Sequence, residues 1–350
     1  MPDAGLLDSP QALATRYDVA LLDLDGVVYV GSHEVAGAAA ALASARELGM
    51  RLAFVTNNAA RPPSAVAAHL SELGVPATPG EVITSAQAAA HYLAERLPPG
   101  SRVLVVGTTG LVEALSERGL VAASSADEQP RAVVQGYSPD TNWRMLAEGA
   151  VAIRRGLPWV ATNLDATVPS PRGPLPGNGS LVAALRHATG VTPVSTGKPN
   201  PTMHRESVER SEAQRPLVVG DRLDTDIEGA NAAGCASLLV LTGVTSAPDL
   251  LAAPAKQRPS YIAHGLGGLL EGHPAPATVD GAVRCGGWSV HPGDELRLAT
   301  LPGQTRGAAL DALRSLCVAA WRMGVTRCAA DDEHADSVLD ELGLRRSSAV

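Results

Sequence analysis

Short runs of apolar residues alternate with longer Ala-rich stretches along the chain up to about residue 270. Runs with the length and apolar content of buried strands occur at residues 19–22, 52–56, 81–85, 216–221 and 236–243. Stretches typical of helices occupy residues 36–48, 64–73 and 86–97. We expect Ser64 and Ser85 to be the N-caps of the second and third helices. Strands that alternate with helices predict an α/β fold with a parallel sheet.

A second α/β series follows the break "LPPGS" at residues 97–101 and closes near residue 195. A further change of composition lies at 272–278, where "GHPAPAT" is typical of a linker. The pattern therefore predicts a discontinuous parallel-sheet core, an inserted α/β unit and a short C-terminal α+β module. Their expected bounds are residues 1–97 with 192–270 for the core, 98–191 for the insert and 271–350 for the module.

Composition and charge narrow the classes of function. With 45% hydrophobic and 18% charged residues, the chain is typical of a globular protein rather than a disordered one. A net charge of −8 argues against nucleic acid and against an anionic membrane as partners. The four cysteines lack CxxC spacing, so we expect free thiols and a cytoplasmic protein.

Chemically versatile residues follow several of the predicted strands. Asp23, Thr56 and Asp221 each end or directly follow an apolar run, which places them at the carboxyl edge of a parallel sheet. Lys198, one of only two lysines in an Arg-rich chain, precedes a predicted helix. A lysine supplies a compact point charge that an arginine does not replace. We expect these four residues to meet in one crevice.

Phosphoryl transfer through an aspartyl-phosphate is the chemistry that this set favours. Asp23 would attack phosphorus, and Asp25 would protonate the leaving oxygen and later accept a proton from water. Thr56, the amides of Asn57 and Asn58, and the Lys198 charge would hold the phosphoryl oxygens.

Two carboxylates beside a phosphate require a hard cation, most simply Mg²⁺. Asp23, Asp221 and the backbone carbonyl of Asp25 are the predicted ligands. Asp224 and Asp226 are expected to be supporting acids outside the ligand set.

The ordered segments "DLDGVVYVG", "VTNN", "TGKPNP" and "VGDRLDTDIEGANAAG" resemble the four motifs of the haloacid dehalogenase (HAD) superfamily of phosphatases. The segment "ATNLDATVPSPRGPLPGNGSLVAAL" looks like the large α/β cap of its p-nitrophenylphosphatase and phosphoglycolate phosphatase branch. The resemblance covers about residues 18–262. It implies a HAD-like Rossmannoid core with a C2-type cap, and it implies the same roles for Asp23, Asp25, Thr56, Lys198 and Asp221.

The substrate is expected to be a small phosphorylated alcohol that the insert selects. Relatives that act on pyridoxal phosphate carry a histidine near the position of Val168, so its absence here argues against an aromatic phosphate. The insert's few aromatic residues are expected to pack in its core, and a pocket without them favours a small aliphatic phosphate over a nucleotide. The whole architecture resembles bacterial members that act on glycerol 3-phosphate, our first expectation. Phosphoglycolate, nucleoside monophosphates and a broad substrate range stay open, as does a non-catalytic sensor of phosphorylated metabolites.

The C-terminal run "QTRGAALDALRSLCVAAWRMGVTRCAADDEHADSVLDELGLR" is similar to the second half of the GCN5-related N-acetyltransferases. Gln304, Gly307 and Ala309 match the loop that holds the coenzyme A pyrophosphate in that family. The first half of such a domain is missing, so we do not expect acyl-CoA to bind here. The open alternatives are packing on the core, self-association into a homo-oligomer, acyl-CoA sensing and a bifunctional phosphatase and acyltransferase.

Overall fold

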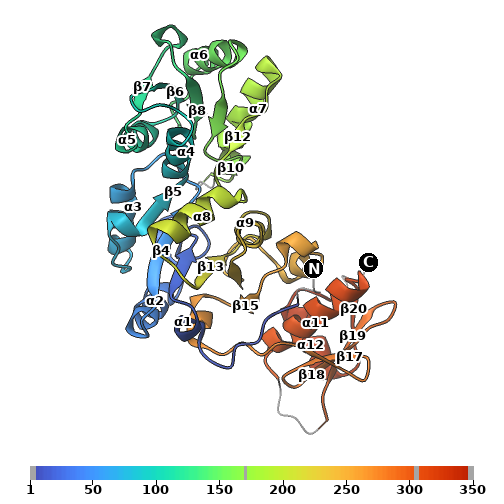
Figure 1. Ribbon diagram of the computed structural model, residues 1–350. Helices are drawn as coiled ribbons and strands as arrows, with labels where there is room; N and C mark the ends of the chain where they lie inside the picture. The colour runs from blue at the N-terminus through green and yellow to red at the C-terminus, as the bar shows by residue number, and fades with distance from the viewer. Residues whose placement is uncertain (1–4, 169–171, 303–306, 346–350) are drawn as a thin grey trace. The chain divides into compact units, whose positions relative to one another are not determined.

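The computed structural model describes residues 5–168, 172–302 and 307–345 (Figure 1). Contacts divide the chain into two compact units. The first unit comprises residues 1–30, 34–51 and 214–350, and the second comprises residues 31–33 and 52–213. The chain passes between the units at residues 30–31, 33–34, 51–52 and 213–214, and the second and third of these points lie within β3 (His33–Glu34) and β4 (Arg51–Thr56).

Four parallel strands in the order β15, β14, β13, β1 form the sheet of the first unit. In the three strands β1, β13 and β14, every residue except Ser237 is apolar or glycine, as a sheet with both faces covered requires. The elements of this part are α1 (Leu13–Arg16), β1 (Val19–Leu22), β2 (Tyr29–Val30), α2 (Ala38–Glu47), β13 (Pro216–Gly220), the π-helix η3 (Leu223–Ile227), α9 (Glu228–Ala233), β14 (Ala236–Val240), α10 (Ala247–Leu251), η4 (Ala255–Gln257), β15 (Tyr261–Ala263) and η5 (Leu266–Leu270).

The second unit contains a five-stranded parallel sheet in the order β12, β9, β8, β6, β7 and a parallel pair, β4 and β5. Its elements besides β4 are α3 (Pro63–Glu72), η1 (Pro79–Glu81), β5 (Val82–Thr84), α4 (Ser85–Ala94), β6 (Arg102–Val106), α5 (Thr109–Glu117), β7 (Val121–Ala123), η2 (Ala126–Glu128), β8 (Ala132–Gln135), α6 (Trp143–Arg154), β9 (Trp159–Ala161), β10 (Thr167–Val168), β11 (Leu175–Pro176), α7 (Asn178–Thr189), β12 (Val194–Ser195) and α8 (Pro201–Arg210).

Successive residues of β6 point to opposite faces of the five-stranded sheet, as the pleat of a strand dictates. Val103 packs in a cluster with residues of α4 and α5, whereas Leu104 packs in a cluster with residues of α6 and α7. The predicted α/β pattern of the insert is thus confirmed, with helices on both faces of its sheet.

The C-terminal module folds as a mixed sheet with two helices. Strands β16 (Ala277–Val279), β17 (Ala282–Cys285), β18 (Trp288–His291) and β19 (Leu296–Thr300) are antiparallel, and β20 (Cys328–Ala330) pairs parallel with β19. Helix α11 (Ala309–Met323) lies against this sheet and α12 (Glu333–Glu341) follows β20 (Figure 1).

The module and the rest of the first unit share one hydrophobic core. Leu250, Leu251 and Ile262 on the sheet side belong to the same cluster as Leu313 and Leu316 of α11. The indole Nε1 of Trp321 also donates to the carbonyl oxygen of Leu250 at 3.0 Å. The module is therefore packed into its unit and is not a tethered appendage.

Several local predictions were wrong. Ser64 lies inside α3, whose N-cap is Pro62, and the N-cap of α4 is Thr84 rather than Ser85. Thr84 is the N-cap because it forms a capping box with Gln87: the Thr84 hydroxyl accepts a hydrogen bond from the Gln87 amide, and the Gln87 side chain accepts one from the Thr84 amide. The expected linker at 272–278 contains His273, which is 2% exposed and pairs with Ser9 in a β-bridge.

No helix within the described ranges is both long and apolar enough to cross a bilayer. All four cysteines are free thiols, as the spacing predicted.

Candidate active site

Two aspartates meet because they follow neighbouring strands that run in parallel. Leu22 of β1 is in register with Val219 of β13, and the amide of Asp23 continues this ladder by donating to the Val219 carbonyl at 2.8 Å. Asp221 follows the last residue of β13 in the same way. Both carboxylates therefore leave the sheet at its carboxyl edge, where ligand sites of open α/β sheets lie.

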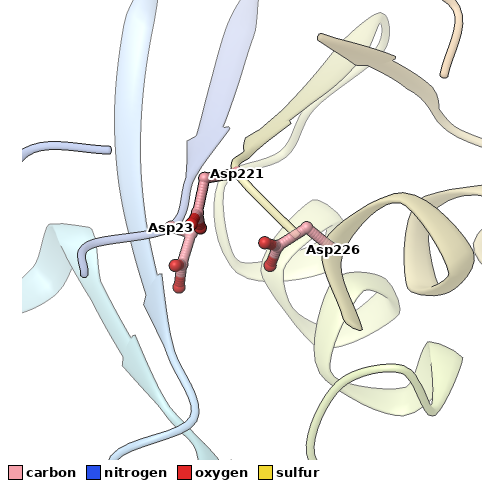
Figure 2. Close-up of side chains that lie close together, drawn as sticks. All are labelled: Asp23, Asp221 and Asp226. Atoms are coloured by element: carbon pink, nitrogen blue, oxygen red, sulfur yellow. The ribbon is translucent and has the colours of Figure 1, made fainter. Parts of the chain in front are cut away.

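A third carboxylate joins them from the π-helix η3 that follows β13. Ligand oxygens of Asp23, Asp221 and Asp226 lie within 4.8 Å of one another, and Figure 2 shows the Asp226 carboxylate pointing toward the other two. Asp221 and Asp226 are each only 1% exposed. π-Helices are rare in proteins, but those that do occur are often found at functional sites. Here the π-helix directs Asp226 toward the sheet edge.

The three carboxylates are arranged so that together they could hold a metal ion. Buried negative charges at this separation repel each other and are costly unless a cation or donors compensate them, and carboxylate oxygens suit hard divalent cations. Asp226, which we expected outside the ligand set, lies inside the group. The Asp25 side chain is exposed and is not one of the three, so any ligand from that residue would be its backbone carbonyl.

The loop after β14 holds Asp221 in place, a contribution that the strand pattern alone did not reveal. The Val244 amide donates to Asp221 Oδ2 at 2.7 Å, and the Thr245 hydroxyl donates to the Asp221 carbonyl at 2.6 Å. Two glycines allow the close approach: a Cβ on Gly26 would lie 2.6 Å from Asp221 Oδ2, and one on Gly243 would lie 1.9 Å from the same oxygen. The signal for this loop was its place after another predicted strand.

Replacement of Gly243 by alanine is therefore expected to displace the Asp221 carboxylate and to weaken divalent-cation binding by about tenfold or more, as changes beside metal ligands typically do. Calorimetric titration with Mg²⁺ and with Ca²⁺ measures the loss. Gly267→Ala is the matched control, because a Cβ there meets no atom within 4 Å. Equal cation affinity in the two variants would contradict this account of the site.

Asp224, the other expected supporting acid, has a different environment. Its carboxylate accepts from Arg222 Nε at 3.1 Å and from Arg222 Nη2 at 2.9 Å, and its side chain is 60% exposed. Partial burial opposes ionisation, but the Arg222 hydrogen bonds and charge outweigh it and lower the pKa of Asp224. Asp224 lies outside the three-carboxylate group.

The second unit brings together the residues that were predicted to hold phosphate. Thr56 ends β4 and is 3% exposed, and its hydroxyl accepts from the Asn58 amide at 3.1 Å. Lys198, 4% exposed, donates from Nζ to the Val55 carbonyl at 3.3 Å. The side chain of Asn57 bonds to both the amide and the carbonyl of Lys198. Strand end and lysine loop are thus adjacent although about 140 residues separate them in the chain.

A buried histidine lies near this lysine. His204 of α8 is 1% exposed. Burial, with a smaller contribution from the Lys198 charge, lowers the pKa of His204 to about 3. The ring is therefore neutral at physiological pH and adds no positive charge beside Lys198.

The sequence interpretation missed three polar residues of the second unit. Asn163 Nδ2 donates to the Asn57 carbonyl at 2.7 Å, Asp165 Oδ2 accepts from Asn57 Nδ2 at 3.1 Å, and Asn178 Nδ2 donates to the Asn163 carbonyl at 2.8 Å. Asn163 and Asp165 lie in the loop after β9 but do not directly follow the strand, so the strand-end rule that selected Thr56 does not reach them.

The aromatic residues of the insert divide into two groups. Trp159 is 3% exposed, as predicted for a core residue. Trp143 was also expected in the core, but it is 82% exposed, because it is the first residue of α6, beyond the part of the helix that packs on the sheet. Helical periodicity does not distinguish the packed turns of a helix from a terminal turn in solvent.

Three segments match known families. Residues 20–121 match the haloacid dehalogenase-like hydrolases, residues 195–269 match a second HAD-hydrolase-like family, and residues 285–344 match the GCN5-related N-acetyltransferase like domain. These matches confirm the resemblances drawn from the sequence motifs.

Proteins and structures similar over most of their length agree. The chain is 44% identical to D-glycerol 3-phosphate phosphatase of Mycobacterium tuberculosis, covering 96% of this chain and 97% of that protein. An acid sugar phosphatase of Staphylococcus saprophyticus is 36% identical over 67% of this chain and 90% of its own length. A crystal structure of the Mycobacterium tuberculosis glycerol phosphate phosphatase in complex with magnesium matches with a TM-score of 0.89 and 45% identity, covering 96% and 99% of the two chains. The chain thus belongs to the haloacid dehalogenase-like hydrolases and is a phosphatase of that family, with an inserted α/β cap and a C-terminal N-acetyltransferase-like module.

Proposed function

We propose that this phosphatase hydrolyses glycerol 3-phosphate to glycerol and phosphate through an aspartyl-phosphate formed on Asp23. The observation that carries the proposal is the group of Asp23, Asp221 and Asp226 at the carboxyl edge of the sheet. Asp23 is the one member that is only half-buried, so its carboxylate is the one accessible to a substrate. The Mycobacterium tuberculosis relative, similar over nearly the whole chain, supplies the choice of substrate.

In the proposed first step, a carboxylate oxygen of Asp23 attacks phosphorus, and the bond from phosphorus to the glycerol oxygen breaks. Asp25 gives its proton to that oxygen, so glycerol leaves as a neutral alcohol. In the second step, water attacks the phosphorus of the aspartyl-phosphate, and Asp25 takes a proton from it. Phosphate leaves, and both carboxyl groups return to their starting states.

The two aspartates are suited to different tasks because they differ in environment. Asp23 extends the β1 ladder, and the hydrogen bond from its backbone amide to the Val219 carbonyl fixes its position. Asp25 is exposed in the following loop, where it forms a β-bridge with Tyr29, so it can exchange protons with solvent between steps.

Thr56, the amides of Asn57 and Asn58, and Lys198 are proposed to hold the phosphoryl oxygens. The supporting observation is their packing at one strand end in the second unit. The Lys198 ammonium is buried, and the histidine near it is neutral and adds no second positive charge. Positive charge near developing negative charge lowers the barrier of a loose phosphoryl transfer.

Mg²⁺ is the proposed metal, held by Asp23, Asp221 and the carbonyl of Asp25, with Asp226 a further candidate ligand. Its contribution when bound would be to neutralise the acids and polarise the phosphoryl group. Crystal structures of the Mycobacterium tuberculosis glycerol phosphate phosphatase in complex with magnesium and with calcium support this choice.

A panel of phosphate monoesters tests the substrate. We expect Mg²⁺-dependent release of phosphate, with the highest kcat/KM for glycerol 3-phosphate, ahead of phosphoglycolate, sugar phosphates and nucleoside monophosphates. A higher kcat/KM for another monoester would replace the substrate and keep the phosphatase. No release from any monoester, together with thermal stabilisation by one of them, would instead favour a sensor of phosphorylated metabolites.

The C-terminal module is proposed to be structural and not an acyltransferase. The Trp288 indole donates to the Ala308 carbonyl at the start of α11, where a Cβ on Gly307 would lie 2.5 Å from the indole nitrogen. The indole thus lies against the helix start where a pyrophosphate would have to bind, and Asp311 of the first turn is already paired with Arg314 at 2.6 Å. Gln304 of the predicted coenzyme A loop lies outside the described residues. Binding of acetyl-CoA by the intact chain would support the bifunctional alternative.

A further inference from the structure

The side chain of Asn57 forms a two-sided link to the backbone of Lys198. Asn57 Oδ1 accepts from the Lys198 amide at 2.9 Å, and Asn57 Nδ2 donates to the Lys198 carbonyl at 3.2 Å. Hydrogen bonds to both peptide groups that flank one Cα fix the direction in which its side chain leaves the backbone. The position of the Lys198 ammonium therefore depends on where the Asn57 amide is held.

Asn57 is in turn held from three directions. Its carbonyl accepts from Ser85 Oγ at 2.6 Å and from Asn163 Nδ2 at 2.7 Å, and its Nδ2 donates to Asp165 Oδ2 at 3.1 Å. Close packing adds to these bonds, since a Cβ on Gly197 would lie 2.7 Å from Asn57 Oδ1. Ser85, at the start of α4, and Asn163, 4% exposed, are buried, so their hydrogen bonds to the half-buried Asn57 are partly shielded from water.

Residues 163–165 belong to the inserted α/β unit. Asn163 and Asp165 follow β9, the Asp165 amide donates to Asn163 Oδ1 at 3.2 Å, and the buried Asn178 at the start of α7 donates to the Asn163 carbonyl. The chain of bonds thus runs from two elements of the insert, through Asn57, to Lys198.

We propose that Asn57 is a positioning residue for Lys198. Asp165 holds the Asn57 amide in the orientation that this role requires. The Asn57 side chain then holds the lysine loop rather than the phosphate, and the insert influences phosphate binding through residues 163–165. The inference rests on the proposed role of Lys198 in holding the phosphoryl group.

Exchange of the two side chains tests the link. Asn57→Asp places two carboxylates together and removes the donor to the Lys198 carbonyl, so we expect kcat/KM to fall about 100-fold, the effect of a misplacement near 1 Å. Inorganic phosphate should inhibit this variant much more weakly. In the double variant Asn57→Asp, Asp165→Asn, the amide at 165 donates to the carboxylate at 57, and we expect recovery of about tenfold. The recovery is incomplete because the bond to the Lys198 carbonyl stays lost.

Asn231→Asp is the matched control. Asn231 Nδ2 donates to the backbone carbonyls of Lys256 and Arg258 at 2.9 and 3.0 Å. Like Asn57, it therefore bonds to the backbone of a lysine, but this lysine lies in the first unit and has no proposed role in phosphate binding. We expect this variant to keep its phosphate inhibition constant. Mg²⁺ affinity should be unchanged in all variants, because the three-carboxylate site belongs to the first unit.

The outcomes separate the inference from the proposed function. No phosphate release by the wild type would end the proposed function, whereas an active wild type makes the variants decisive. The positioning role would be overturned if Asn57→Asp, Asn231→Asp and the wild type had the same inhibition constant for phosphate. It would also be overturned if the double variant recovered no kcat/KM relative to Asn57→Asp. If Asn57→Asp does not fold, Asp165→Ala carries the test, and we expect the inhibition constant for phosphate to be about three to ten times higher from the loss of one partly buried hydrogen bond.

Discussion

Asp23→Asn is expected to abolish phosphate release, with kcat lower by more than about 10⁴-fold, while the fold is retained. The amide nitrogen and oxygen of asparagine are poor nucleophiles, so no aspartyl-phosphate can form and only the contribution of binding is left. The substitution also removes one of three negative charges whose oxygens lie within 4.8 Å, so the folded state should not lose stability.

Single-turnover assays with glycerol 3-phosphate and a thermal melt measure the two parts of this prediction. Asp127→Asn is a suitable control, because Asp127 is an exposed acid of the second unit, paired with Arg155 at 2.9 Å on the surface. Metal-dependent phosphate release by the Asp23→Asn protein at a rate near that of the control would exclude Asp23 as the nucleophile.

Arg314→Met is expected to lower the free energy of unfolding by about 3–5 kcal/mol, the usual effect of breaking a buried charge pair. The Arg314 side chain is 7% exposed, and it donates to Asp311 Oδ1 at 2.6 Å and to the Ile262 carbonyl at 2.9 Å. It also lies 3.3 Å from His273 Nδ1. Methionine fills much of the same space, but it leaves the Asp311 carboxylate and the Ile262 carbonyl without this donor.

Urea denaturation of the full chain measures the loss, and Arg322→Met on the same helix is the control. Arg322 donates a hydrogen bond to the Thr278 hydroxyl and is exposed on α11. A stability loss for Arg314→Met no larger than that for Arg322→Met would show that the module does not support its unit through this contact. The comparison separates a packed module from one that merely follows the core in the chain.

Two of the three grouped aspartates could be located from the sequence because a general rule relates strand ends to sheet edges. Asp23 and Asp221 each follow an apolar run, and parallel strands deliver the residues after them to the same edge. The same reasoning selected Thr56. It did not select Asp226 as part of the group, because a carboxylate six residues beyond the end of β13 (226 − 220) reaches the edge only through the π-helix η3.

Helix starts and surface positions were predicted less well for a local reason. Ser64 and Ser85 are good capping residues, yet Pro62 and Thr84 occupy the cap positions. Capping depends on the backbone geometry at one residue, and neighbouring residues of similar type compete for it. Trp143 was misplaced because the pattern of a helix does not say how far its packed face extends.

The sequence by itself determined the α/β class, the family and the positions of Asp23 and Asp221 at strand ends, because each depends on periodicity or on residues adjacent in the chain. Only the tertiary structure decided that Asp226 joins the carboxylate group, that Asn57 bonds to Lys198 and to the insert, and that the C-terminal module shares a core with its unit. These features depend on contacts between residues far apart in the chain, such as the 141 positions between Asn57 and Lys198. Their partners are selected by packing, which leaves no periodic signal in the sequence.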